Sequence, residues 1–104
     1  MKDLNRTTIL GNIGNEPKLT LSKNGKDVCI LNVATESENK KTTWHRVIVL
    51  NKEARYVSDV FKKGDRIFVE GKINNSEGHD REGNKVMRAD ILSEFIGHKG
   101  SNCA

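Results

Sequence analysis

Apolar residues recur at alternate positions in four separate segments of this chain, Thr7-Thr8-Ile9-Leu10 forms a further extended segment near its start, and one segment changes to helical spacing. Because side chains alternate between the two faces of a strand, this pattern predicts strands with one buried and one exposed face. The expected strands are residues 5–13, 27–36, 43–50, 65–73 and 85–95. A chain with this pattern is expected to fold as an all-β domain with one short helix.

The alternation also assigns inward-facing side chains to each of the later strands. The expected core residues are Cys29, Leu31, Val33, Val47, Val49, Ile67, Val69, Ile73, Met87, Ala89 and Ile91. The Asn24-Gly25 pair predicts a hairpin turn between two extended segments. Residues 74–84 are polar and are expected to form a connection that ends in a turn, with Gly83 at its tight position.

The segment from 52 to 63 predicts the helix. Ala54, Val57 and Phe61 recur at helical spacing, with Val60 beside them, and so define one apolar face. Asn51 is expected to cap the N-terminal end, where Glu53 suits the helix dipole. At the other end we expect Lys62 and Lys63 in the last turn, followed by Gly64 as a left-handed cap.

Five strands with a helix between the third and the fourth is the element order of an OB-fold, a five-stranded barrel. In that fold the second and third strands bind nucleic acid, together with the loops between strands 1 and 2 and strands 4 and 5. Trp44, the only tryptophan, lies on the third expected strand. If Val47 and Val49 face the core, Trp44 and Arg46 lie side by side on the opposite face. An aromatic ring beside a guanidinium can stack a nucleobase and hold its phosphate, although a half-buried aromatic beside a solvated base explains this strand equally well.

Length and composition limit the class of protein. At 104 residues we expect one domain over residues 1–96 and a short disordered tail over 97–104. No apolar run is long enough for a membrane span or a signal peptide, which predicts a cytoplasmic protein without a membrane partner. The net charge is +4, and the basic surplus lies around Trp44, as polyanion binding would require.

Catalysis and metal binding find little support in the sequence. No nucleophile–base constellation or phosphate-cradling loop is evident, so we expect neither an enzyme nor a cofactor. The potential metal ligands are scattered without paired spacing: Cys29, His45, His79, His98 and Cys103. His45 faces the core side of its strand, where packing or a subunit contact is a better interpretation than a catalytic base.

The chain resembles the bacterial single-stranded-DNA-binding protein family over residues 5–95. The matching segments are residues 9–14 with Pro17, 31–35, 44–47, 63–65 and 69–73. Their order along the chain makes the resemblance specific. It implies an OB-fold that forms homo-oligomers, usually tetramers, and that binds single strands without sequence preference.

The resemblance also implies roles for individual residues. Trp44 stands at the position of the family's stacking tryptophan. Basic positions implicated in following the phosphate backbone are matched by Arg6, Arg46, Lys52 and Lys63. Strand and loop placement adds further candidate phosphate contacts, for which a merely solvated base is in several cases the better interpretation: Lys40, Lys41, Lys72, Lys85 and Arg88.

Departures from the family pattern modify these expectations. Asn39, Leu50 and Gly78 stand where the family usually has further stacking aromatics. Since each stacked base contributes roughly 1–3 kcal/mol, we expect weaker and more salt-sensitive binding than is usual in the family. The flexible linker and acidic tip that recruit replication proteins are also expected to be absent. That feature favours an alternative, a primosome-type adaptor of single-stranded DNA and replication proteins, dimeric and similar to primosomal replication protein N.

Overall fold

The computed structural model describes residues 3–98 and contains six strands and one helix in this range. In chain order they are β1 (Thr7–Ile13), β2 (Leu19–Leu21), β3 (Asp27–Glu36), β4 (Thr42–Leu50), α1 (Asn51–Val60), β5 (Arg66–His79) and β6 (Lys85–His98). The five long strands coincide with the five expected strands. The short β2 is additional and pairs with the start of β3. Residues 99–104, most of the expected tail, lie outside the described residues, and β6 continues to His98.

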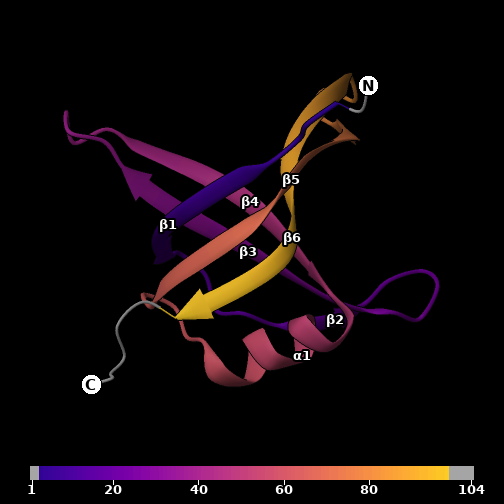
Figure 1. Ribbon diagram of the computed structural model, residues 1–104. Coiled ribbons are helices and arrows are strands. Elements are labelled where there is room, and N and C mark those ends of the chain that lie inside the picture. Colours follow the sequence, from indigo (N-terminus) through magenta and orange to yellow (C-terminus); the bar gives the residue numbers. More distant parts are fainter. Residues whose placement is uncertain (1–2, 99–104) are drawn as a thin grey trace.

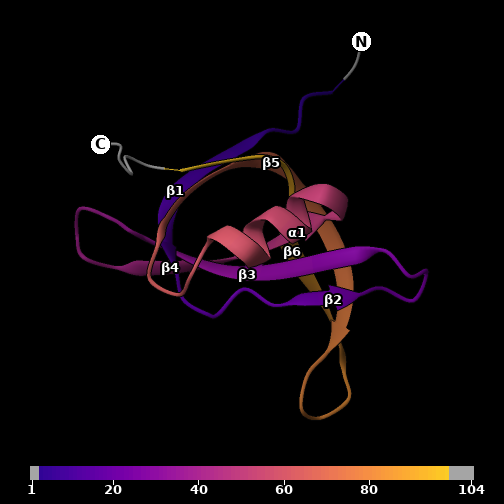
Figure 2. The same ribbon diagram turned by 90° about the horizontal axis from the view of Figure 1, so that it is seen from below.

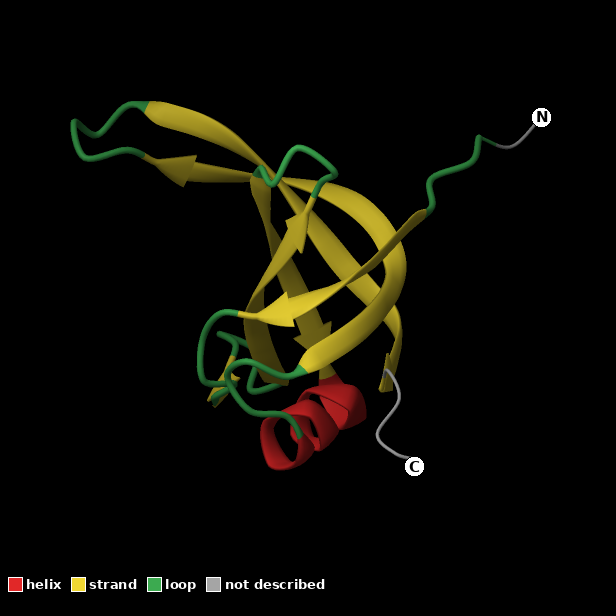
Figure 3. Ribbon diagram, turned by 90° about the vertical axis from the view of Figure 1, so that its left-hand side faces the viewer, coloured by secondary structure: helices red, strands yellow, loops and turns green. Residues whose placement is uncertain are grey.

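The long strands close into a barrel in the order β1-β5-β6-β4-β3, and β3 returns to pair with β1 (Figures 1 and 3). Closure occurs at Asn12↔Ala34 and Ile13↔Val33. Only β4 and β6 run parallel; every other pair is antiparallel. This is the strand order of an OB-fold with a helix between its third and fourth long strands, which confirms the predicted fold class.

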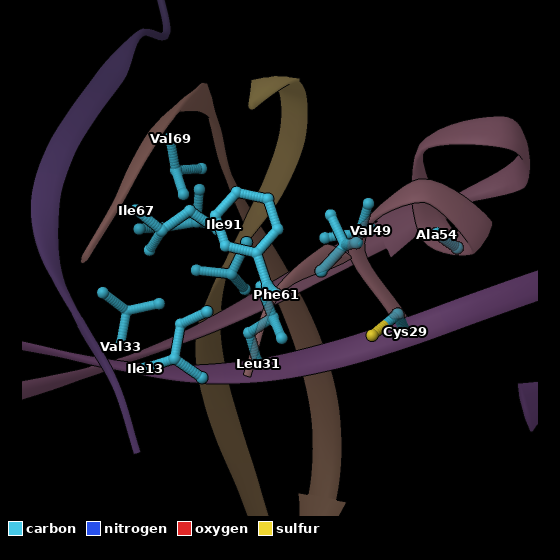
Figure 4. Packing of buried hydrophobic residues seen from close by; sticks show 12 residues of the cluster. Ile13, Cys29, Leu31, Val33, Val49, Ala54, Phe61, Ile67, Val69 and Ile91 are labelled. Carbon is cyan, nitrogen blue, oxygen red and sulfur yellow. The ribbon is translucent and has the colours of Figure 1, made fainter. Parts of the chain in front are cut away.

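The barrel interior is filled by the residues that alternation assigned to it. Cys29, Leu31 and Val33 from β3 are fully buried, as are their neighbours from β4 and β5. Phe61 follows α1 and packs into the same cluster (Figure 4). α1 itself lies across one end of the barrel (Figure 3), where Ala54 and Val57 are buried. Burial raises the pKa of the Cys29 thiol, so this cysteine behaves as a core residue.

Three expected core residues are exposed instead. Ile73 is 49 % exposed, Met87 is 66 % exposed, and Ala89 is also at the surface. The reason is that residues 74–79, expected in a polar connection, continue β5 and pair with β6 to His79↔Lys85. This ribbon projects beyond the barrel (Figure 2), so an inward-facing position there has no core to enter.

Both predicted turns are present. Gly25 has φ +77° in the hairpin between β2 and β3, where its N–H donates to the Ser22 carbonyl. At the tip of the β5–β6 ribbon, Gly83 has φ +85°, and the Asp80 carboxylate accepts hydrogen bonds from two backbone N–H groups of the turn. Glycine is favoured at these positions because positive φ is costly for other residues.

The helix is correct in place but not in its caps. Leu50 occupies the N-cap position and makes no side-chain capping bond, whereas Asn51 is the first helical residue and has φ +61°. The chain turns sharply out of β4 there, and asparagine tolerates the left-handed conformation better than most residues. The helix ends at Val60 with Phe61 as an extended C-cap, so Gly64 (φ +95°) belongs to the turn that follows. Lys62 and Lys63 lie in that turn as well.

In residues 3–98, no helix has the length and apolar character that a bilayer span requires.

Glu53, in the first turn of α1, gives a test of how the helix is seated. Burial raises the pKa of its carboxyl group, although the backbone of Ile96 hydrogen-bonds to it. The charged form is therefore penalised in the folded state above this pKa, and the penalty disappears as the pH falls through it. We expect Glu53→Gln to be more stable than wild type near neutral pH and to lose this advantage in acid. Urea unfolding at several pH values measures the difference, and Glu38→Gln in the exposed β3–β4 loop, the control, should not show it.

Candidate nucleic-acid interface

The outward side chains of β4, β5 and β6 form one continuous surface, which we call the Trp44 face. Val47 of β4 pairs with Ile91 of β6, and both point inward, so the preceding Arg46 and Asp90 both point outward. The register of β5 and β6 also places Lys72, Ser76 and Arg88 on this side. The Trp44 face consists of Trp44, Arg46, Lys72, Ser76, Arg88 and Asp90.

Trp44 is 60 % exposed, which is unusual for so large an apolar side chain on a central strand. Its ring lies against Gly14, because a Cβ placed on Gly14 would lie only 2.4 Å and 2.7 Å from Cζ3 and Cη2 of the indole. Gly14 follows β1, and β3 lies between β1 and β4. The ring therefore reaches across β3, one edge rests on the bare backbone of Gly14, and much of its surface is open to solvent.

The corner that supports the ring is firmly attached to β3. The Gly14 N–H donates to the Asn32 carbonyl at 2.7 Å. The Asn15 side chain accepts from the Asn32 N–H at 2.8 Å and donates to the Ile30 carbonyl at 3.1 Å. Next along the chain, the Glu16 carboxylate accepts from the backbone N–H of Lys63 at 3.1 Å. These bonds fix the corner against which the Trp44 ring lies, and they bring the Lys63 backbone to the same corner.

Arg46 has a carboxylate partner. Its Nη1 lies 3.6 Å from Oδ2 of Asp90, and the same oxygen accepts a hydrogen bond from the Ser76 hydroxyl at 3.0 Å. Asp90 is only 1 % exposed, whereas the Arg46 side chain is 35 % exposed. The pair orients the guanidinium on the sheet and offsets part of its charge, so Arg46 attracts a phosphate less strongly than an unpaired arginine.

The other predicted basic residues are spread around this face. Lys72 and Arg88 lie on it, whereas Lys85 has the opposite parity on β6. Lys40 and Lys41 are exposed in the β3–β4 hairpin loop, where Lys40 has φ +63°. Lys52 is exposed in the first turn of α1, at the far end of β4 from Trp44, and Arg6 precedes β1. The structure thus brings Trp44, Arg46, Lys72 and Arg88 together and leaves the remaining bases at the edges.

The three positions without the expected aromatics differ in their surroundings. Asn39 is exposed in the β3–β4 loop, and Leu50 is half-buried at the end of β4. Gly78, near the tip of the β5–β6 ribbon, is covered by the Arg88 guanidinium. Two of the three positions therefore lie in hairpins that project from the barrel (Figure 2).

Several residues of the site are not evident from the sequence alone. The importance of Gly14, Asn15, Ser76 and Asp90 depends on contacts between segments distant in the chain, although Gly14 does fall in a matching segment of the resemblance. His45 is accounted for by its neighbour: Nε2 lies 2.8 Å from the Thr35 hydroxyl, and the ring is half-buried. A packing role thus explains His45 without catalysis.

Comparison with known proteins agrees with this geometry. The model of the single-strand binding protein family matches residues 4–98. The chain is also similar to a protein described as single-stranded DNA-binding protein 1 of Xylella fastidiosa (strain 9a5c), with 31 % identity over 114 aligned residues. That alignment covers 98 % of this chain and 84 % of the relative.

Proposed function

The chain belongs to the single-strand binding protein family, and we propose that it binds and protects single-stranded DNA without sequence preference, through the Trp44 face. It is a binding protein and not an enzyme. The observation that carries the proposal is the exposed ring of Trp44, supported on Gly14 and flanked by basic residues. We further propose a role in replication, recombination or repair, in the cytoplasm.

The chemistry of this face supports binding that does not depend on sequence. Every base has a π-face, so a supported indole stacks any of the four bases. Lys72 lies on the same surface and can follow the phosphates, which are alike in every strand. Reading a sequence instead requires hydrogen-bonding groups aimed at base edges in a fixed arrangement. A supported ring flanked by basic side chains is therefore suited to binding without sequence preference.

We assign the remaining predicted bases a secondary part in phosphate neutralisation. Arg46 is oriented and partly neutralised by Asp90, so it supplies position more than net charge. The exposed residues at the edges can extend the path of the strand beyond the sheet: Arg6, Lys40, Lys41, Lys52, Lys63 and Lys85. Members of the family form homo-oligomers, and we propose a tetramer or a dimer here, whose copies would bring several such faces together.

The alternative of a primosome-type adaptor receives no specific support. The family match covers residues 4–98, and the relative is itself described as a single-stranded DNA-binding protein. We therefore retain single-strand binding as the proposed function. A stable complex with a helicase or a helicase loader would be the observation in favour of the adaptor.

Titration of the intact protein with oligo(dT) tests the proposal directly. Because Trp44 is the only tryptophan, selective excitation of its fluorescence reports this ring alone. We expect strong quenching at low salt and a linear fall of log K with log salt, with a slope of about −0.7 for each phosphate neutralised. Binding that shifts the oligonucleotide in a gel but leaves Trp44 fluorescence unchanged would refute the stacking role.

A further inference from the structure

The guanidinium of Arg88 lies face-on over Gly78. A Cβ placed on Gly78 would be 2.7 Å from Nε, 3.0 Å from Cζ and 3.2 Å from Nη2 of Arg88. If this point lay in the guanidinium plane, beside the edge between Nε and Nη2, Cζ would be the farthest of the three atoms. Cζ is instead closer to the point than Nη2 is. The plane therefore rests on the glycine, with one face toward the backbone of β5.

The opposite face of this guanidinium is open. Arg88 is exposed, and within residues 3–98 its side chain forms neither an ion pair nor a hydrogen bond with another side chain or with the backbone. Arg46, by contrast, is held by Asp90. Arg88 is thus an unpaired, planar cation that is positioned by its contact with Gly78 rather than by a carboxylate.

Gly78 and the Arg88 guanidinium lie on the same side of the sheet as Trp44. Arg88 is the register partner of Ser76, whose hydroxyl donates to Asp90. Asp90 in turn forms an ion pair with Arg46, which is the second residue after Trp44 on β4. A strand that stacks on Trp44 and continues along this line over β6 arrives at the Arg88 plane. Trp44 and Arg88 therefore lie on the same side of the sheet, and each contacts a glycine.

We propose that Arg88 is a second base-stacking platform, on which the guanidinium plane seated on Gly78 receives an unpaired base of the bound strand. The inference rests on the proposed function and deepens it. Guanidinium planes stack on nucleobases because they are flat, delocalised and weakly hydrated. This arrangement requires that residue 78 has no side chain, since any Cβ there would displace the Arg88 guanidinium plane from Gly78.

The competing role for Arg88 is a point-charge contact with phosphate, and Arg88→Lys separates the two. Lysine keeps the charge but has no plane. If Arg88 stacks a base, Arg88→Lys should weaken oligo(dT) binding about 5-fold or more, since base stacking is worth roughly 1–3 kcal/mol, and the salt slope should not change. Arg81→Lys in the turn of the same ribbon is the control and should bind like wild type.

Two further measurements complete the test. Gly78→Ala leaves Arg88 intact but displaces its plane, so it should reproduce the loss seen with Arg88→Lys, and thermal unfolding of both variants verifies that they fold. On an abasic strand of equal length, wild type and Arg88→Lys should bind alike, because there is no base to stack.

The outcomes also separate this inference from the proposed function. If wild type binds oligo(dT) and Trp44 is quenched while both Arg88→Lys and Gly78→Ala bind like wild type, the Arg88 platform is wrong and the proposed function stands. An equal loss for Arg88→Lys on abasic and normal strands overturns the platform as well. If wild type itself does not bind oligo(dT), the proposed function fails.

Discussion

Replacing Gly11 by alanine should lower the free energy of unfolding by about 3 kcal/mol, at the upper end of what overpacking usually costs. Gly11 lies on β1, opposite Ile67 of β5, one residue before the strand begins to pair with β3 and close the barrel. A Cβ at this position would lie 2.2 Å from the carbonyl oxygen of Ala34. That atom belongs to the backbone of β3 and cannot rotate away, so the barrel must open locally to admit a methyl group.

Urea unfolding measures this loss, and Gly97→Ala is a matched control on strand β6. A Cβ on Gly97 would meet no atom nearer than 3.4 Å, which is ordinary contact. The control adds the same methyl group and removes the same backbone freedom, so it should change stability by less than about 1 kcal/mol. Equal stabilities for the two variants would show that the β1–β3 closure is not tightly packed at Gly11.

The sequence predicts the barrel well because alternation and burial coincide where strands enclose the core. For β3 even the strand limits agree, and Cys29, Leu31 and Val33 face inward as expected. The prediction fails where strands leave the core. Met87 and Ile73 keep the alternation but lie at or beyond the end of the barrel. The alternation of apolar residues identifies the side of a strand on which a residue lies. How deeply that residue is buried depends on how far the ribbon extends beyond the barrel.

The candidate site shows the same division. Exposure of Trp44 follows from the alternation of one strand, since Val47 and Val49 must face the core. The partner of Arg46 does not follow, because Asp90 becomes its neighbour only when β4 and β6 pair in parallel. Local patterns thus reveal the groups that carry the chemistry, and tertiary pairing decides which of them are free to use it.

Gly78 illustrates how the structure changes an expectation. The missing aromatic at this position predicts weaker stacking and greater dependence on salt. The Arg88 plane lies there instead, and it combines a flat surface with a positive charge. If it stacks a base, part of the expected loss of affinity is recovered without an aromatic ring, and the salt dependence is still expected to be steep because that platform is itself a cation.

Replacing Trp44 by alanine should weaken binding to oligo(dT) by about 5- to 150-fold, the equivalent of the 1–3 kcal/mol that one stacked base contributes. The loss should appear with an unchanged salt slope, because the substitution removes no charge. Anisotropy of a labelled oligonucleotide measures it without relying on tryptophan fluorescence. Trp44→Phe keeps an aromatic ring and should stay within a few-fold of wild type.

Gly14→Ala shows whether the position of the ring matters as well as its presence. The new methyl group would lie 2.4 Å from the indole, so the ring must move, whereas no backbone atom stands as close as at Gly11. We therefore expect Gly14→Ala to fold with little loss of stability and to bind DNA more weakly than wild type, but more strongly than Trp44→Ala. Wild-type affinity in Gly14→Ala would mean that the indole stacks equally well from a displaced position, and the glycine seat would then be irrelevant to binding. A loss that matches Trp44→Ala would instead mean that stacking depends on the ring being held in this one place.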